Sequence, residues 1–78
     1  MDWNVIVTAA HNLHTVEITY SKISGEVVQH EVEPYSTRGN KFYGFRTDVG
    51  EIRAFIIDNI IDAIETTNSF SPRWPVEL

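Results

Sequence analysis

The sequence predicts a mostly β protein with one short helix at its start, and three observations lead to this prediction. Apolar residues in the first segment are spaced for one face of a helix. Residues 14–21 then alternate between apolar and polar side chains, which is the period of a half-buried strand. Glycine turns divide much of the remaining chain into short segments rich in β-branched and aromatic residues. The chain has 78 residues, so we expect one domain over residues 1–78.

The first half of the chain is expected to form a helix and then three strands. The helix spans residues 2–12, and Asp2 can accept hydrogen bonds from the N–H groups of its first turn. Its apolar face consists of Trp3, Ile6, Val7, Ala10 and Leu13. The strands lie near residues 14–21, 27–36 and 40–47, with glycine turns between them.

Two later segments depart from a simple alternating pattern. Pro34 has no N–H to donate, so the second strand is an edge strand, bends at Pro34 or ends there. Residues 52–65 fit a helix by their apolar spacing, yet their paired isoleucines suit a buried strand equally well. Asp58 and Asn59 favour a turn, so two short strands broken at that point are as consistent as one helix. Residues 67–78 contain two prolines and are expected to form an irregular tail.

Composition excludes several classes of function. Six basic and eleven acidic residues give a net charge of −5, which argues against a reader of duplex DNA, because phosphate neutralisation needs clustered Lys and Arg. The absence of cysteine excludes disulfides, thiolate metal sites and cysteine nucleophiles. No apolar run approaches the ~20 residues of a membrane-spanning helix, and the first residues lack a basic signal region. We therefore expect a cytoplasmic protein without a membrane partner.

Several short motifs follow one another over most of the chain, from about Ala9 to Pro72. They are Val16-x-Ile18-x-Tyr20, Val32-Glu33-Pro34-Tyr35, Gly50-Glu51-Ile52-Arg53-x-Phe55 and Phe70-x-Pro72. In this order the motifs resemble the WYL domain family. The sequence departs from that family at its namesake triplet, which falls on Asn40-Lys41-Phe42. It departs again at three basic positions of the family, which are occupied here by His30, Ile56 and Asn59.

The resemblance implies a small SH3-like (Sm-like) barrel of five strands behind a short N-terminal helix, with the barrel over residues 14–66. The ambiguous stretch then becomes two strands, near residues 51–57 and 60–66. We expect Trp3 and Trp74 to cover the open ends of the barrel. The side chains expected to point into the barrel are those of Tyr35, Tyr43, Phe45, Phe55 and the isoleucines.

The resemblance also implies a function. Members of the family are bacterial or phage-borne, take part in transcription regulation, and are regarded as sensors of nucleotides or single-stranded nucleic acid. We therefore expect a non-enzymatic regulatory module that needs no cofactor and binds a small anionic or nucleotide-like ligand or a single strand. The ligand-binding residues expected on this reading are Arg53, Tyr20, His30, Lys41, Tyr43 and Arg46.

The chemistry of these side chains suits such a ligand. Arg53 offers a planar fork of donors to a phosphate, and aromatic residues on the Lys41–Arg46 strand can stack on bases. His30 is charged only below a pKa near ~6.5, so anion affinity is expected to strengthen as the pH falls from neutral. The structural alternative for Arg53 is a surface ion pair with Glu51, Glu33 or Asp58.

A second reading belongs to another class of function. In it, the protein is an adaptor or inhibitor subunit that uses an acidic face to dock a basic protein partner. That face would consist of Glu17, Glu31, Glu33, Asp62 and Glu65. Edge strands of so small a barrel can also pair between copies and give a homo-oligomer. No catalytic motif is present, and His11 and His14 lack the further ligands of a metal site, so we expect neither catalysis nor a metal.

Overall fold

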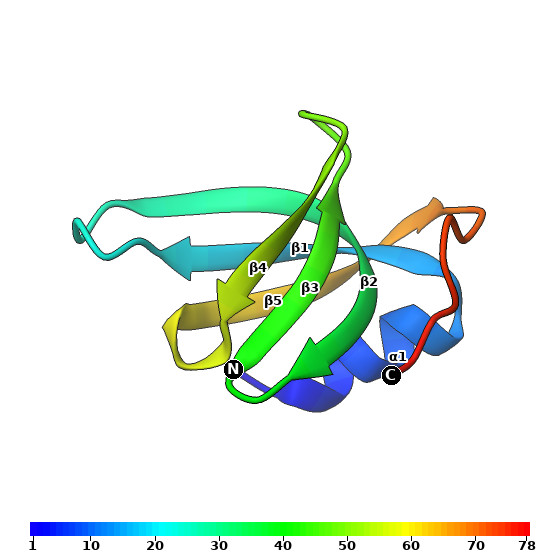
Figure 1. Cartoon of the computed structure of the whole chain (residues 1–78), viewed down its shortest axis with the longest axis horizontal. Coiled ribbons are helices and arrows are strands. Elements are labelled where there is room, and N and C mark those ends of the chain that lie inside the picture. Colours follow the sequence, from blue (N-terminus) through cyan, green and yellow to red (C-terminus); the bar gives the residue numbers. More distant parts are fainter.

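The computed structural model describes residues 1–78 and contains one helix and one five-stranded antiparallel sheet (Figure 1). The elements in chain order are α1 (Trp3–His11), β1 (His14–Ser21), β2 (Val27–Arg38), β3 (Lys41–Arg46), β4 (Glu51–Ile56), a single 3-10 turn η1 (Ile57–Asn59) and β5 (Ile60–Ser69). The mostly β prediction is confirmed. Residues 51–66 form strand, turn and strand, as the resemblance implied, and no helix of the protein has the length and apolarity to cross a membrane.

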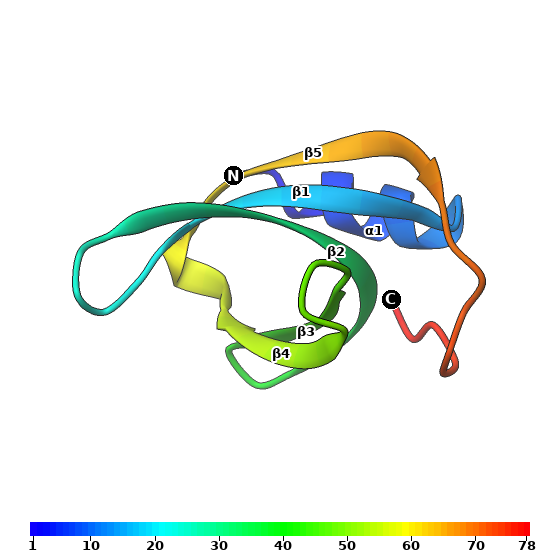
Figure 2. The same cartoon turned by 90° about the horizontal axis from the view of Figure 1, so that it is seen from above.

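The sheet curls because β2 belongs to both of its halves. The strand order is β4-β3-β2-β1-β5. The first half of β2 pairs with β1 as far as Val32, and from Val32 onward β2 pairs with β3. The pairing of β2 with β3 shifts register at a bulge between Pro34 and Ser36, and a bulge bends the strand that carries it. The strand β2 therefore bends at Pro34, which is one of the three outcomes expected there. Figure 2 shows β2 passing from the layer of β1 and β5 to the layer of β3 and β4.

The inner face of the curled sheet and one face of α1 enclose the core. The core consists of Ile6, Ala9, Val16, Ile18, Val32, Phe42, Phe55, Ile60 and Ala63. Phe42 stacks on Phe55 with 6.1 Å between ring centroids, and Trp3 of α1 meets Phe42 edge-on at 5.7 Å. Asp2 begins the helix as expected, since its Oδ1 accepts a 3.0 Å hydrogen bond from the N–H of Asn4.

Several expectations about the core are wrong. Tyr35 is buried on the outer side of the sheet, against Phe70 and Trp74, and not inside it. Four of the isoleucines expected inside are exposed, namely Ile23, Ile52, Ile61 and Ile64. Phe42, rather than Tyr43, fills the interior, because alternation along β3 places Phe42 and Gly44 on the inner side and Tyr43 and Phe45 on the outer side. Phe45 is buried, but on the outside of the barrel-like sheet. Both sides of β3 carry aromatic residues, so the alternating pattern alone did not indicate which side is the interior.

The C-terminal tail covers this outer aromatic cluster. The strand β5 runs to Ser69, three residues beyond the expected end, because Ser69 pairs with His14 at the start of β1. The chain then crosses the outer face of β2 and β3. Phe70 and Trp74 meet the Tyr35 ring edge-on, at 5.7 and 5.3 Å between centroids. Trp74 therefore packs on the outer face and does not cover an open end.

Gly44 of β3 lies where the side chain of Val32 in β2 leaves no room for a Cβ atom. A Cβ atom at this position would lie 3.0 Å from both Cβ and Cγ2 of Val32 and 3.3 Å from the Phe42 ring. We expect Gly44→Ala to lower the free energy of unfolding by about 1–3 kcal/mol, the usual cost of overpacking. Urea unfolding measures this loss. The control is Ala54→Ser on the exposed neighbouring strand, expected within ~0.5 kcal/mol of wild type; equal stability of the two variants would contradict the prediction.

Candidate ligand-binding site

Four of the six residues expected to bind a ligand share the inner, concave face of the sheet. They are Tyr20, His30, Arg46 and Arg53. His30 lies opposite the core residue Ile18, and Arg46 lies opposite the core residue Val32. Because paired residues of antiparallel strands point to the same side, His30 and Arg46 point to the side of the core. Arg53 is opposite Gly44, two residues from Arg46 along β3, and shares that side.

An aromatic row connects this region to the helix. The ring of His30 lies 6.2 Å from that of Phe55, which stacks on Phe42. Tyr20 meets Phe55 edge-on at 5.2 Å, and its hydroxyl accepts a 3.1 Å hydrogen bond from the backbone N–H of Ile56. That bond joins β1 to β4, two strands that are not paired in the sheet. Tyr20 therefore contributes to the closure of the fold as well as to the candidate site.

Both arginines of the concave face have carboxylate partners on their own hairpin. Arg46 donates from Nε and Nη2 to the two carboxylate oxygens of Asp48, at 3.0 and 2.5 Å. These bonds lower the pKa of Asp48. Arg53 pairs with Glu51, the alternative foreseen from the sequence, but 45% of the Arg53 side-chain surface stays exposed. The exposed Arg53–Glu51 pair contributes only ~0–1 kcal/mol, and each of the two guanidinium groups keeps further N–H donors for an incoming anion.

His30 is half-buried beside these charges. Burial lowers its pKa below the ordinary value of 6.5, and the positive charge of Arg46 lowers the pKa further, whereas Asp48 raises it. We expect anion affinity to rise as the pH falls and His30 becomes charged. Because the pKa of His30 is lowered, this rise must occur at a lower pH than an unperturbed imidazole would give.

The other two expected residues, Lys41 and Tyr43, lie on the opposite, outer face. Lys41 is exposed and lies across the β2–β3 hairpin from Arg38. Neither of these cations has a carboxylate within ion-pair distance, in contrast to the other four basic residues. Tyr43 is half-buried and lines a cavity of about 330 Å³ together with Trp74. The structure therefore divides the expected site between two faces of the sheet.

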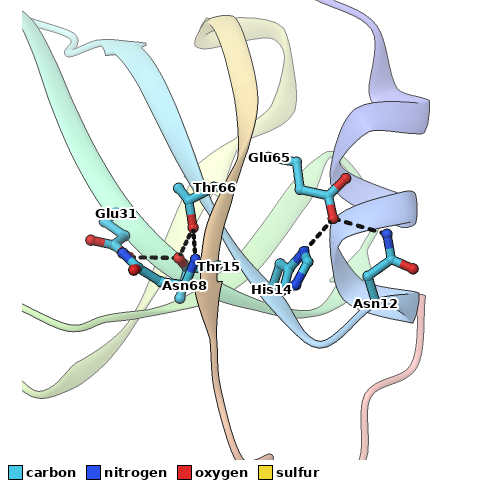
Figure 3. Close-up of polar contacts among 7 residues, drawn as sticks. All are labelled: Asn12, His14, Thr15, Glu31, Glu65, Thr66 and Asn68. Carbon is cyan, nitrogen blue, oxygen red and sulfur yellow. Dashed lines mark hydrogen bonds and ion pairs between the residues drawn. The ribbon is translucent and has the colours of Figure 1, made fainter.

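The acidic residues of the second reading are divided as well, and several of them are bound within the protein (Figure 3). Glu31 accepts hydrogen bonds from the side chains of Thr15, at 2.6 Å, and Asn68, at 2.8 Å. Glu65 accepts from Asn12 at 2.9 Å and is bonded to His14 at 2.7 Å. These bonds lower the pKa of Glu31 and of Glu65.

Glu33 is buried beneath the tail. There Arg73 balances its charge and the hydroxyl of Tyr35 donates a hydrogen bond to it. Arg73 donates to both carboxylate oxygens, at 3.1 and 3.3 Å, and the Tyr35 hydroxyl donates at 2.6 Å. The guanidinium of Arg73 also lies 4.0 Å from the centroid of Phe45. Sequence reasoning missed Arg73. The signal available was a basic residue next to Trp74 in a proline-containing tail.

No family model matches the sequence, and no curated protein matches it. Among solved structures, the fold is similar to proteasome accessory factor B/C (PafBC) of Arthrobacter aurescens, with a TM-score of 0.76 and 28% sequence identity. The match covers 90% of this chain but only 12% of the PafBC chain. PafBC is a regulator that contains a WYL domain. The likeness supports a WYL-like relationship.

The charges around His30 predict how its pKa responds to substitution. We expect Arg46→Gln to raise the pKa of His30, because it removes a neighbouring positive charge, and Asp48→Asn to lower it. NMR titration of the His30 ring proton measures both shifts. The neutral imidazole is favoured in the folded state, so its contribution to stability is present above pH 6.5 and is lost as the pH falls. Shifts in the same direction for both variants would contradict this electrostatic account.

The contact of Tyr35 with the C-terminal tail makes the stability of the fold depend on pH in the alkaline range. Burial raises the pKa of Tyr35 to about 12, from an ordinary value of 10.0. The protonated hydroxyl is favoured in the folded state, so its contribution is present below pH 10 and is lost as the pH rises toward 12. We expect the melting temperature of the wild type to fall over this range and that of Tyr35→Phe to fall less steeply. Parallel curves for the two proteins would show that Tyr35 is not the titrating group.

Proposed function

We propose that this protein is a regulatory WYL-like module that binds a small anionic or nucleotide-like ligand, including the end of a single-stranded nucleic acid, on its concave face. The observation that carries this proposal is that Arg46, Arg53, His30 and Tyr20 lie on one side of the curled sheet. The likeness to the regulator PafBC supports the regulatory part of the proposal. The module recognises its ligand and performs no chemistry on it.

Binding is an exchange of partners at the two arginines. At Arg53 a phosphate can take the place of Glu51, because that ion pair is exposed and weak. At Arg46 it must displace the two bonds of Asp48, which a doubly charged phosphate can replace with its own bidentate bonds. The half-buried imidazole of His30 offers a ring for contact with a base, and it adds positive charge at low pH. Release of Asp48 also removes the two side-chain bonds that tie the turn between β3 and β4 to Arg46. We propose that this turn transmits the bound state to a partner.

A second candidate function is docking of a basic protein partner. Glu17 and Asp62 favour it, since both lack a cationic partner and lie on the outer face of β1 and β5. The exposed Ile64 lies opposite Glu17 on that face, with 58% of its surface accessible. The strand β5 is an edge of the sheet, so a second copy of the chain is another occupant to test.

The role of Arg53 can be tested by charge reversal. We expect Arg53→Glu to weaken binding of a fluorescently labelled dinucleotide by about 10–100-fold, because it removes a charge-assisted hydrogen bond and adds repulsion. Fluorescence anisotropy measures the affinity. Arg38→Glu is the matched control: it changes the net charge equally, but at the β2–β3 hairpin, and we expect at most a ~3-fold loss.

Three results would decide against the concave face. Equal losses of dinucleotide affinity in Arg53→Glu and Arg38→Glu would show that the net charge of the protein, and not a local site, determines binding. A larger loss in Arg38→Glu would move the ligand to the hairpin. No binding by the wild type, with retained binding of a basic protein by Arg53→Glu, would favour the docking function.

A further inference from the structure

A cavity on the outer face of the sheet has features that the proposed anion site does not use. It lies between strands β2, β3 and β4 and the C-terminal tail, and its volume is about 330 Å³. This is near the lower limit of ~300–1,000 Å³ for small-molecule sites, so it suits a compact group. The residues that matter here are Tyr35, Tyr43, Trp74, Ser36, Ile52 and Glu77.

The cavity is bounded by aromatic rings in different planes. The planes of Tyr35 and Trp74 are 83° apart, with 5.3 Å between their centroids, and Tyr43 adds a third ring from β3. Trp74 keeps 48% of its surface exposed although it packs on Tyr35. Trp74 and the half-buried Tyr43 are the rings that can offer a π face to an occupant, whereas Tyr35 is only 3% exposed and supports Trp74 from behind. A π face beside an acidic group attracts a cation.

This aromatic cluster already holds one cation. The guanidinium of Arg73 lies over the face of Phe45 at 4.0 Å, and Phe45 packs against Trp74 at 6.0 Å. Arg73 itself is committed to Glu33 and leaves the cavity open to another positive group.

The one carboxylate of the cavity has no partner. Glu77 makes no side-chain hydrogen bond and no ion pair, and its position is held by its backbone N–H, which donates to the Tyr35 carbonyl at 2.7 Å. An aromatic cavity with a free carboxylate selects a cation. Because hydrogen-bond acceptors are few, the occupant must lose little hydration, and an alkylated ammonium loses less than a bare, strongly hydrated ammonium.

We propose that this outer cavity binds an alkylated ammonium group. The group is carried either by a free small molecule or by a methylated lysine side chain of a partner protein. This site is separate from the anion site, since Arg53 and Tyr43 point to opposite sides of the sheet. Lys41 lies two residues from Tyr43 on the outer side and weakens cation binding by repulsion, without lining the cavity.

The test is titration of the wild-type protein with tetramethylammonium chloride, followed by the NMR signal of the Trp74 indole N–H. We expect a saturable shift that potassium chloride does not produce. Glu77→Gln should weaken binding by about 3–10-fold, and Lys41→Gln should tighten it by about 2-fold, because the two substitutions remove charges of opposite sign. Arg53→Glu should not weaken this binding, because Arg53 lies on the other side of the sheet, whereas it should weaken dinucleotide binding at the concave site.

A second arm distinguishes the two sources of the group. Trimethyl-lysine within a short peptide is compared with the free tetramethylammonium ion: tighter binding of the peptide supports a protein partner, and equal binding supports a free small molecule. The proposal is overturned if potassium chloride gives the same shift, if Glu77→Gln has no effect, or if Lys41→Gln weakens binding.

Discussion

The bend of β2 at Pro34 is the constraint from which both faces of the protein follow. Because one strand pairs with β1 before the bend and with β3 after it, the sheet must curl. The curl brings Phe42 and Phe55 over the core residues of β1, and it gathers the arginines of β3 and β4 on the same concave side. Pro34 is suited to this place, since its missing N–H falls at an interruption of the ladder.

The tail is part of the fold because Glu33 is buried. A carboxylate with 4% of its surface exposed is costly unless it is paired, and Arg73 of the tail is its cationic partner. The Tyr35 hydroxyl completes the arrangement, and no buried side-chain polar atom of the protein is left without a partner. The same pairing that satisfies Glu33 places Trp74 beside Tyr35, so the outer cavity exists as a consequence of a stability requirement in β2.

Much of the fold could be predicted from local pattern, and the errors have physical causes. The helix and β1 have one apolar face each, so their periods identified them. Residues 52–65 are apolar on both sides, so only the resemblance separated strands from a helix. The end of β5 was missed because the residues after Glu65 are polar and show no alternation. They extend the strand through side-chain hydrogen bonds, of Thr66 with Thr15 and of Asn68 with Glu31, whose partners are 51 and 37 positions apart in sequence.

The candidate site could be predicted only in part. The type of a residue indicates which ligands its side chain can bind, but only the register of the strands indicates on which face of the sheet it lies. Alternation along β3 already indicates that Arg46 lies on the other side of the strand from Lys41 and Tyr43. That Arg53 lies on the same side as Arg46 follows only from the register of the β3–β4 hairpin. The sequence itself places a carboxylate two residues from each arginine, Asp48 after Arg46 and Glu51 before Arg53. On the proposed function, these carboxylates keep the empty site near neutral in an acidic protein. An anion must then outcompete them, and a doubly charged phosphate gains more from two guanidinium groups than a singly charged carboxylate does.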